Sequence, residues 1–122
     1  MISSQDIEKV QEKARQIKAL VIGDAMLDQY IYGTVDRISP EAPVPVLSHQ
    51  RTEIKAGGSA NVALNLAAWG CKTTLIGLTG NDLNANKLAS LLEEKHIRHH
   101  FVRSESRPTT IKTRVVASSH HL

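Results

Sequence analysis

Cysteine, aromatic residues and long apolar runs are scarce in this chain, and each scarcity excludes a class of protein. Among its 122 residues one is a cysteine, Cys71, so no disulfide can form within the chain. The cysteine and histidine residues also lack the short, regular spacing of a structural zinc site. No segment approaches the roughly 20 apolar residues that a membrane-spanning helix needs, and the first residues carry charges in place of an export signal. We therefore expect a cytoplasmic protein with no metal site and no membrane partner.

A strong charge of one sign is also missing. The chain has 15 lysine and arginine residues against 12 acidic ones, which gives a formal net charge of +3. Because the basic residues are not clustered and aromatic residues make up 3% of the chain, the pattern does not favour a nucleic-acid-binding protein. The hydrophobic share of 41% is typical of a globular protein, and the length fits one small domain.

Helical and strand-like segments alternate along much of the chain. Three segments carry apolar residues at helical spacing, namely residues 4–17, 58–69 and 84–95. Three shorter apolar runs are typical of strands, namely residues 19–23, 72–78 and 97–102. The order strand, helix, strand, helix, strand implies right-handed crossovers. We therefore predict an α/β fold with a mostly parallel sheet flanked by helices.

The segment from Asp28 to Lys55 and the segment 109–117 have a more exposed pattern. In the first, apolar and polar residues interleave around three prolines, Pro40, Pro43 and Pro45. Proline cannot donate to a sheet ladder, so we expect short exposed strands and connections there, forming a flap. Residues 109–117 alternate β-branched and polar residues, which predicts a half-exposed strand that could pair with the flap.

Two glycines open the second predicted helix, within the sequence Gly57-Gly58-Ser59-Ala60-Asn61. Unpaired N–H groups and the positive end of the helix dipole meet at such a turn, where a hydroxylated or anionic ligand could approach closely. The alternative is an ordinary helix entry with Ser59 as the cap. The sequence is not a P-loop, because no Gly-Lys-Ser or Gly-Lys-Thr follows.

Two acidic and two basic residues are further candidates for ligand binding. Asp24 and Asp28 follow the first predicted strand, at the edge where open α/β sheets bind ligands, and could accept hydrogen bonds from sugar hydroxyls. For Asp24 the alternative is a cap of the turn. Lys112 and Arg114 lie two residues apart on a predicted strand, so their side chains share a face and could clamp a phosphate. For this pair the alternative is a solvated strand face.

Other basic residues show no pattern that selects one function. Three of them lie in the flap, namely Arg37, Arg51 and Lys55. Like Lys112 and Arg114, they could bind a phosphate or lie on a solvated strand face. Three histidines close the third predicted helix, namely His96, His99 and His100. Cations suit the end of a helix dipole, so we interpret these histidines as surface residues and not as metal ligands.

Four ordered blocks of sequence resemble one protein family. They are VIGDAMLD (21–28), RISPEAPVP (37–45), GGSANVALN (57–65) and TTIKTR (109–114). Between Val21 and Leu122 the chain resembles the N-terminal part of the D-glycero-β-D-manno-heptose-7-phosphate kinases, a branch of the ribokinase-like (PfkB) carbohydrate kinases. In many bacteria this kinase is the first half of a bifunctional protein whose second half is an adenylyltransferase.

The resemblance implies a fold and a set of binding residues. Residues 1–122 would form the N-terminal portion of a ribokinase-like domain, with a truncated, mostly parallel sheet and a small β lid from about 29–55 and 109–117. Sugar hydroxyls would be held by Asp28, Gly57, Gly58 and Asn61, with Asp24 as a further candidate. The substrate phosphate would meet Lys112 or Arg114.

The resemblance also implies what lies elsewhere. The family's Gly-Ala-Gly-Asp element, which supplies the general base and the anion hole, is missing from these residues, and the nucleotide site is missing with it. We therefore expect no catalytic residue in this chain and no bound ATP or Mg²⁺, both of which the complete enzyme uses. After Gly80 the family usually has two acids and then Ala-Gly, whereas residues 81–86 read NDLNAN, so we expect a looser turn.

By resemblance, the complete protein would transfer the γ-phosphate of ATP to the anomeric hydroxyl of heptose 7-phosphate, on the way to ADP-heptose for lipopolysaccharide. The alternatives are a binding or dimerisation module without catalysis, and a fragment of a kinase for another sugar. Residues 118–122 follow a strand directly, which indicates a chain cut short. A sheet cut partway exposes an edge strand and an apolar face, so we expect a homo-oligomer, through the lid or the sheet edge, or poor solubility.

Overall fold

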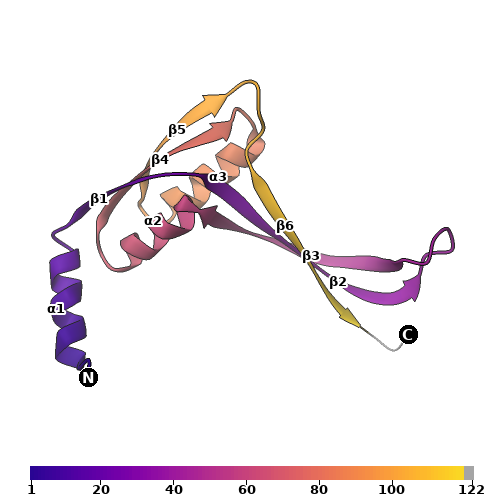
Figure 1. Ribbon diagram of the computed structural model, residues 1–122, viewed down its shortest axis with the longest axis horizontal. Helices are drawn as coiled ribbons and strands as arrows, with labels where there is room; N and C mark the ends of the chain where they lie inside the picture. Colours follow the sequence, from indigo (N-terminus) through magenta and orange to yellow (C-terminus); the bar gives the residue numbers. More distant parts are fainter. Residues whose placement is uncertain (120–122) are drawn as a thin grey trace. The chain divides into compact units, whose positions relative to one another are not determined.

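The computed structural model describes residues 1–119, and the last predicted feature, the chain end at 118–122, lies partly outside them. Helices and strands follow one another in the order shown in Figure 1. They are α1 (Ser4–Ala14), β1 (Lys18–Ile22), β2 (Ala25–Ile38), β3 (Pro45–Gly58), α2 (Ser59–Ala68), β4 (Lys72–Gly80), α3 (Leu83–Glu93), β5 (Arg98–Ser104) and β6 (Ile111–Ser119).

The chain divides into two compact units. The first, here called the helical unit, comprises Met1–Leu27 and Ala56–Thr110. The second, here called the strand unit, comprises Asp28–Lys55 and the chain from Ile111 onward. Most of β2, most of β3 and all of β6 therefore belong to the strand unit, whereas the helices and the other strands belong to the helical unit.

A three-stranded parallel sheet forms the centre of the helical unit. Its strand order is β1-β4-β5. In β1 and β4, Lys18 is opposite Lys72 and Ile22 is opposite Ile76, and in β4 and β5 Thr74 is opposite Arg98. The α/β class and the parallel sheet predicted from the alternating segments are thereby confirmed.

Helices α2 and α3 pack on this sheet and enclose the core. Helix α2 contacts β1 and β4, and α3 contacts β4 and β5. The two connections step in the same direction across the sheet, from β1 to β4 and from β4 to β5, and both helices lie on one face, as Figure 1 shows. The fully buried leucines of this unit come from the strands and from α3, namely Leu27, Leu75, Leu88 and Leu92.

The first helix begins as predicted but ends early. Ser3 caps it, because the Ser3 hydroxyl accepts from the Asp6 N–H at 3.2 Å and the Ser3 N–H donates to the Asp6 carboxylate at 2.9 Å. This is a capping box. The helix was predicted to reach residue 17 but ends at Ala14. The N–H groups of Gln16 and Ile17 bond three residues back, which tightens the chain before β1.

The strand unit differs from the prediction of short strands. Strands β2 and β3 have 14 residues each, and the second sheet has the order β3-β2-β6. Pro40 and Pro43 lie in the six-residue connection, and Pro45 is the first residue of β3, where its missing N–H breaks little of the ladder. The Ser39 N–H donates to the Val44 carbonyl at 2.8 Å and closes the turn. The prolines therefore mark the turn of one long hairpin.

The other predicted helices and strands occur in the predicted order, and their ends shift by one or two residues. Gly70 ends the α2 region with a left-handed φ of 101°, as its position after the helix predicts. In the part of the chain that the structure describes, no helix is long and apolar enough to cross a membrane.

Candidate functional site

The start of α2 is tied to the end of β1 through backbone groups. Gly58 is the N-cap residue, with φ 60° and ψ −132°, a conformation that residues with a Cβ rarely adopt. A Cβ at this position would also collide with the carbonyl oxygen of Asp24. The same carbonyl oxygen accepts a hydrogen bond from the Ser59 N–H at 2.8 Å. Glycine at position 58 is therefore a steric requirement of this turn.

Ser59 is not the cap of this helix. The cap is Gly58, which offers no side chain, and Ser59 is the first helical residue. The Ser59 hydroxyl oxygen is buried and has no hydrogen-bond partner among the described residues. Buried polar atoms in native proteins are nearly always paired, so an unpaired hydroxyl beside the first turn of a helix is a candidate ligand contact. Sequence reasoning had considered Ser59 only as a cap.

The predicted ligand residues of the helical unit gather at this entry. Asp24 is exposed and follows β1, and its backbone carbonyl holds the turn. Gly57 is buried directly before the cap, and Asn61 is exposed in the first turn of α2. The structure therefore brings Asp24, Gly57 and Gly58 together at one strand-to-helix junction, with Asn61 one turn farther along.

In the strand unit, Asp28 and Lys112 form an ion pair across neighbouring strands. The Lys112 ammonium lies 3.4 Å from Oδ1 of Asp28. The Asp28 side chain is 16% exposed, against 51% for Lys112. This carboxylate oxygen is buried and accepts no well-oriented hydrogen bond from the described residues. Asp28 is thus neutralised by a nearby cation while keeping a free acceptor, which suits a hydroxyl donor.

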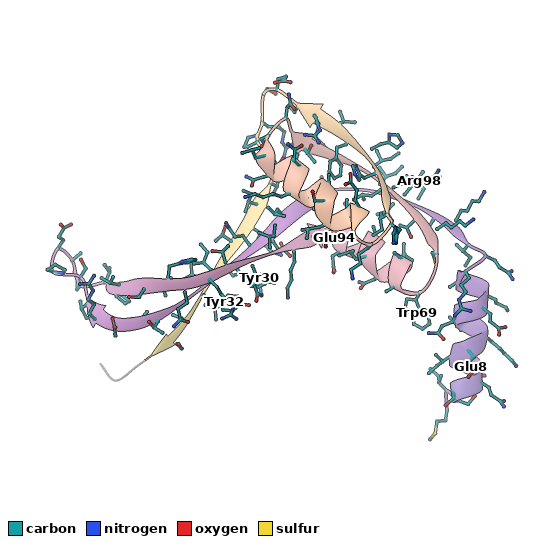
Figure 2. The ribbon with its side chains drawn as sticks, turned by 180° about the vertical axis from the view of Figure 1, so that it is seen from behind. Glu8, Tyr30, Tyr32, Trp69, Glu94 and Arg98 are labelled. Carbon is teal, nitrogen blue, oxygen red and sulfur yellow. The ribbon has the colours of Figure 1, made fainter. Side chains whose placement is uncertain are left out.

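Side chains of alternate residues extend this pair into a larger surface. Tyr30 and Tyr32 follow Asp28 at two-residue spacing, so all three side chains share one face of β2. The two tyrosine rings stack with their centroids 6.3 Å apart. Figure 2 shows both tyrosines on the ribbon of β2.

Two basic residues of β3 lie over the tyrosine rings. The guanidinium carbon of Arg51 is 3.9 Å from the centroid of Tyr32, and the ammonium of Lys55 is 5.2 Å from that of Tyr30. Such cation–π contacts hold the basic groups in place. Arg51 also pairs with Glu53 at 3.3 Å. The sequence had left Arg51 and Lys55 without a role, and the tyrosines were missed because cross-strand neighbours are not visible in a single sequence.

We call this surface the cationic face. It consists of Asp28, Tyr30, Tyr32, Arg51, Glu53, Lys55, Lys112 and Arg114. Arg114 is exposed and two residues beyond Lys112 on β6, so it shares this face. Four basic side chains against two acidic ones give the face a positive charge, and the tyrosines and carboxylates add groups that can contact a sugar. The arrangement suits a small, hydroxylated anion.

Asp82 and Thr109 form a hydrogen-bonded junction at the carboxyl end of β4. The Asp82 carboxylate accepts from the Thr109 hydroxyl at 2.6 Å, from the Thr109 N–H at 2.9 Å and from the Ala85 N–H at 2.9 Å. The Thr109 hydroxyl also accepts from the buried Gly80 N–H at 3.0 Å. The looser turn predicted after Gly80 is therefore wrong, because one remaining acid makes three hydrogen bonds. These bonds, from the Thr109 side chain first, lower the pKa of Asp82 below its usual value.

The three histidines differ in environment. His96 is exposed and has a left-handed φ of 58°. His99 lies in β5, half-buried, with its ring stacked on Phe101 at 4.8 Å and its Nε2 3.2 Å from the Glu93 carboxylate. The interpretation of all three as surface residues is therefore wrong for His99, since alternation along β5 turns it toward α3.

Comparisons with known proteins support the resemblance seen in the sequence. Residues 16–121 match the model of the pfkB family of carbohydrate kinases. The chain is 48% identical over 112 residues to "Bifunctional protein HldE" of Hyphomonas neptunium, covering 91% of this chain and 23% of that protein. It is 45% identical over 111 residues to "D-beta-D-heptose 7-phosphate kinase" of Bordetella bronchiseptica, covering 91% of this chain and 36% of that protein. The chain thus spans about a quarter to a third of these relatives.

Solved structures show the same fold. A carbohydrate kinase from Agrobacterium tumefaciens superposes with a TM-score of 0.69 at 22% identity, over 83% of this chain and 32% of the other. The tetrameric inhibited form of phosphofructokinase-2 from Escherichia coli superposes with a TM-score of 0.62 at 25% identity, over 81% of this chain and 30% of the other. The fold is therefore ribokinase-like. Because residues 16–121 match the family model and the chain is 48% identical to one of these relatives, the chain belongs to the pfkB family of carbohydrate kinases.

Proposed function

We propose that this chain is the sugar-phosphate-binding part of a kinase that phosphorylates the anomeric hydroxyl of D-glycero-D-manno-heptose 7-phosphate. The names of the relatives from Bordetella bronchiseptica and Hyphomonas neptunium support the heptose substrate. The observation that carries the proposal is the buried carboxylate oxygen of Asp28, which forms an ion pair with Lys112 but accepts no hydrogen bond from the described residues.

The two groups have complementary tasks. A sugar hydroxyl donates to Oδ1 of Asp28, and the substrate phosphate accepts from Lys112 or Arg114 on the same face. Because Lys112 lies 3.4 Å from Asp28, the carboxylate partly offsets the positive charge of the lysine. Arg114 supplies the additional positive charge for a phosphate. Arg51 and Lys55 add to the positive potential of the face.

Gly57, Gly58 and Asn61 are assigned to sugar hydroxyls in the helical unit, with Asp24 as a further candidate. The unpaired hydroxyl of Ser59 supports a polar ligand at this helix entry. The strand unit corresponds to the segments for which a lid role was expected, and that role stays a prediction.

ATP and Mg²⁺ belong to the complete kinase in this proposal. Among the described residues, no group of three or more His, Cys, Asp or Glu side chains is placed to hold a metal ion. We therefore derive no step through the nucleotide or its Mg²⁺ from this chain. The chain binds and orients the sugar phosphate, and phosphoryl transfer needs the residues beyond the aligned segment of the relatives.

Calorimetric titration of two variants tests the proposal. We expect Asp28→Asn to weaken binding of heptose 7-phosphate and of heptose alike, by roughly tenfold or more, because a hydrogen bond to a charged group contributes about 1.5–3 kcal/mol. Lys112→Met should weaken the phosphorylated sugar more than the free one. Lys87→Met, at an exposed lysine of α3, is the matched control and should bind as the unsubstituted chain does. Equal affinities for all three variants would contradict the proposal.

The closest alternative is a kinase for another sugar, and the same titration addresses it. Fructose 6-phosphate is a suitable competitor, because a phosphofructokinase-2 is among the similar structures. Tighter binding of fructose 6-phosphate than of heptose 7-phosphate would support the alternative and reject the heptose assignment.

A further inference from the structure

The Asp28 oxygen that pairs with Lys112 is not accessible to a ligand in this structure. The ammonium of Lys112 lies 3.4 Å from Oδ1 of Asp28. The same oxygen is buried and accepts no hydrogen bond from the described residues. A sugar hydroxyl must come within about 2.5–3.0 Å of a carboxylate oxygen to donate a hydrogen bond to it. The oxygen must therefore be uncovered before a sugar can bind to it.

Lys112 is the partner that can move away from this oxygen. Its side chain is 51% exposed, whereas that of Asp28 is 16% exposed. The lysine ammonium ends a flexible four-carbon stem, so it reaches a new partner without a change in the backbone. An ion pair that is partly exposed to solvent contributes little, because water screens both charges. A stronger anion beside Lys112 is therefore sufficient to draw the ammonium away from Asp28.

Arg114 is placed to receive such an anion together with Lys112. Among the described residues Arg114 forms no ion pair, and it is exposed on the same face of β6, two residues from Lys112. The other two basic residues of the cationic face are held over tyrosine rings, Arg51 at 3.9 Å and Lys55 at 5.2 Å. An anion that binds Arg114 therefore has Lys112 as its second cation.

We propose that Lys112 keeps Oδ1 of Asp28 from sugar hydroxyls until a phosphate group binds Lys112 and Arg114. The ammonium and a sugar hydroxyl are both donors, so they compete for the same oxygen. A phosphate group carries about two negative charges at neutral pH and attracts the ammonium more strongly than one carboxylate does. Asp28 then accepts from the sugar. This inference rests on the proposed function, and it adds that Lys112 selects phosphorylated sugars over free ones.

Two ligands that act on one ion pair must affect each other's binding. A phosphate ion that breaks the pair strengthens the binding of a free sugar, and the free sugar strengthens the binding of phosphate by the same factor. The expected factor is about two- to fivefold, which is the contribution of a partly exposed ion pair expressed as a ratio of affinities. A free sugar without phosphate has to displace the ammonium itself, so it binds more weakly.

Calorimetric titration with a free sugar tests this coupling. The chain is titrated with D-glycero-D-manno-heptose in saturating inorganic phosphate and, at equal ionic strength, in chloride. We expect the free sugar to bind about two- to fivefold more tightly in phosphate. Equal ionic strength is needed because salt alone screens the pair between Asp28 and Lys112.

Two variants that each remove one positive charge from β6 separate this inference from a general effect of charge. Lys112→Met should bind free heptose about two- to fivefold more tightly than the unsubstituted chain does, and phosphate should no longer strengthen that binding. Arg114→Met should not strengthen the binding of free heptose, because the ion pair of Asp28 is with Lys112. Both variants should bind heptose 7-phosphate more weakly. Lys87→Met, on α3, is the control that should change neither affinity.

The affinity of Lys112→Met for free heptose decides the inference, and the circular dichroism spectrum confirms that each variant is folded. If this variant binds free heptose no more tightly than the unsubstituted chain, Lys112 does not compete for Asp28 and the inference is wrong. Absence of any strengthening by phosphate would overturn it as well. The proposed function stands in both cases if heptose 7-phosphate binds and Asp28→Asn weakens that binding. If neither sugar binds the unsubstituted chain, the proposed function fails and the inference fails with it.

Discussion

The entry to α2 depends on what single residues can do with their backbone. Gly58 takes a conformation that suits only glycine, and the Asp24 carbonyl oxygen fills the space that a side chain would need. Ser59 then donates its N–H to that oxygen while its hydroxyl stays unpaired. The backbone that carries this hydroxyl is therefore fixed by the turn.

Replacing Gly58 tests this steric account. We expect Gly58→Ala to lower the free energy of unfolding by about 1–3 kcal/mol, because alanine must adopt a strained backbone conformation and its Cβ meets the Asp24 carbonyl. Urea denaturation measures the change, and Lys87→Ala in an exposed part of α3 is the control. A stability equal to that of the unsubstituted protein would mean that the turn relaxes without cost.

Single residues were predicted from the sequence where the motif itself carries the information. The paired glycines, Asp28 and Lys112 could be identified by spacing and by their place after a strand. Ser59 and Tyr32 could not, since an unpaired hydroxyl and a stacked guanidinium depend on three-dimensional neighbours. The ion pair between Asp28 and Lys112 also requires β2 to pair with β6, and no local sequence pattern predicts that pairing.

At the scale of elements, one hydrogen-bonded junction links the ends of β4, α3 and the segment before β6. Asp82 is the N-cap of α3 and accepts two hydrogen bonds from Thr109. The Thr109 hydroxyl in turn accepts a hydrogen bond from the N–H of Gly80. The segment before β6 is therefore held to the consecutive ends of β4 and α3, 27 to 29 residues away in the sequence, by one carboxylate and one hydroxyl. The expected start of a strand at 109 is replaced by this anchor, and β6 begins two residues later.

The lowered pKa of Asp82 makes stability depend on pH in a defined direction. Its hydrogen bonds contribute stability that is fully present above the unfolded-state pKa, about 3.9, and is lost as pH falls through the lower folded-state pKa. We expect the free energy of unfolding to fall as the pH drops below about 4. Asp82→Asn should flatten that fall, although Asp6, whose pKa is also lowered, keeps part of it. Urea denaturation between acidic and neutral pH checks this, with Asp36→Asn as the control.

Thr109→Val tests the other half of the junction. We expect a loss of about 1–3 kcal/mol in the free energy of unfolding, because the buried Gly80 N–H loses its acceptor. Thr110→Val, at the exposed neighbouring position, should change stability little. If both variants are equally stable, the junction contributes no more than an ordinary surface turn.

The elements were predictable where apolar periodicity is strong and uninterrupted. The parallel strands and the two helices that cover them follow from this pattern. The long hairpin of β2 and β3 did not, because three prolines within a few residues suggested repeated breaks, whereas they all lie in or beside a single turn. Pairing across strands, and not local propensity, sets the length of these strands.

At the scale of the whole molecule, the chain belongs to a carbohydrate-kinase family but matches only part of the length of its relatives. The chain has a ribokinase-like parallel sheet, and it matches a quarter to a third of the length of its relatives. The fold class and the family were both predictable from the sequence, whereas the exposure of Leu20 and Ile22 required the side chains to be placed in space.

Self-association is a prediction at this scale. Free edges at β1 and β5 allow strand pairing between copies, so we expect concentration-dependent oligomers of the isolated chain. Analytical ultracentrifugation over a range of concentrations measures this. Edge pairing should survive Ile22→Asp, because strand pairing uses backbone groups and the exposed Ile22 side chain takes no part in it. A monomer at high concentration would contradict the prediction.

Calorimetric titration of the unsubstituted chain with heptose 7-phosphate, with free heptose and ATP as parallel ligands, tests the central claim most directly. The account predicts binding of heptose 7-phosphate, weaker binding of heptose and no binding of ATP, because the cationic face recognises both the sugar hydroxyls and the phosphate. Binding of ATP without binding of the sugar phosphate would contradict the assignment of Asp28, Lys112 and Arg114.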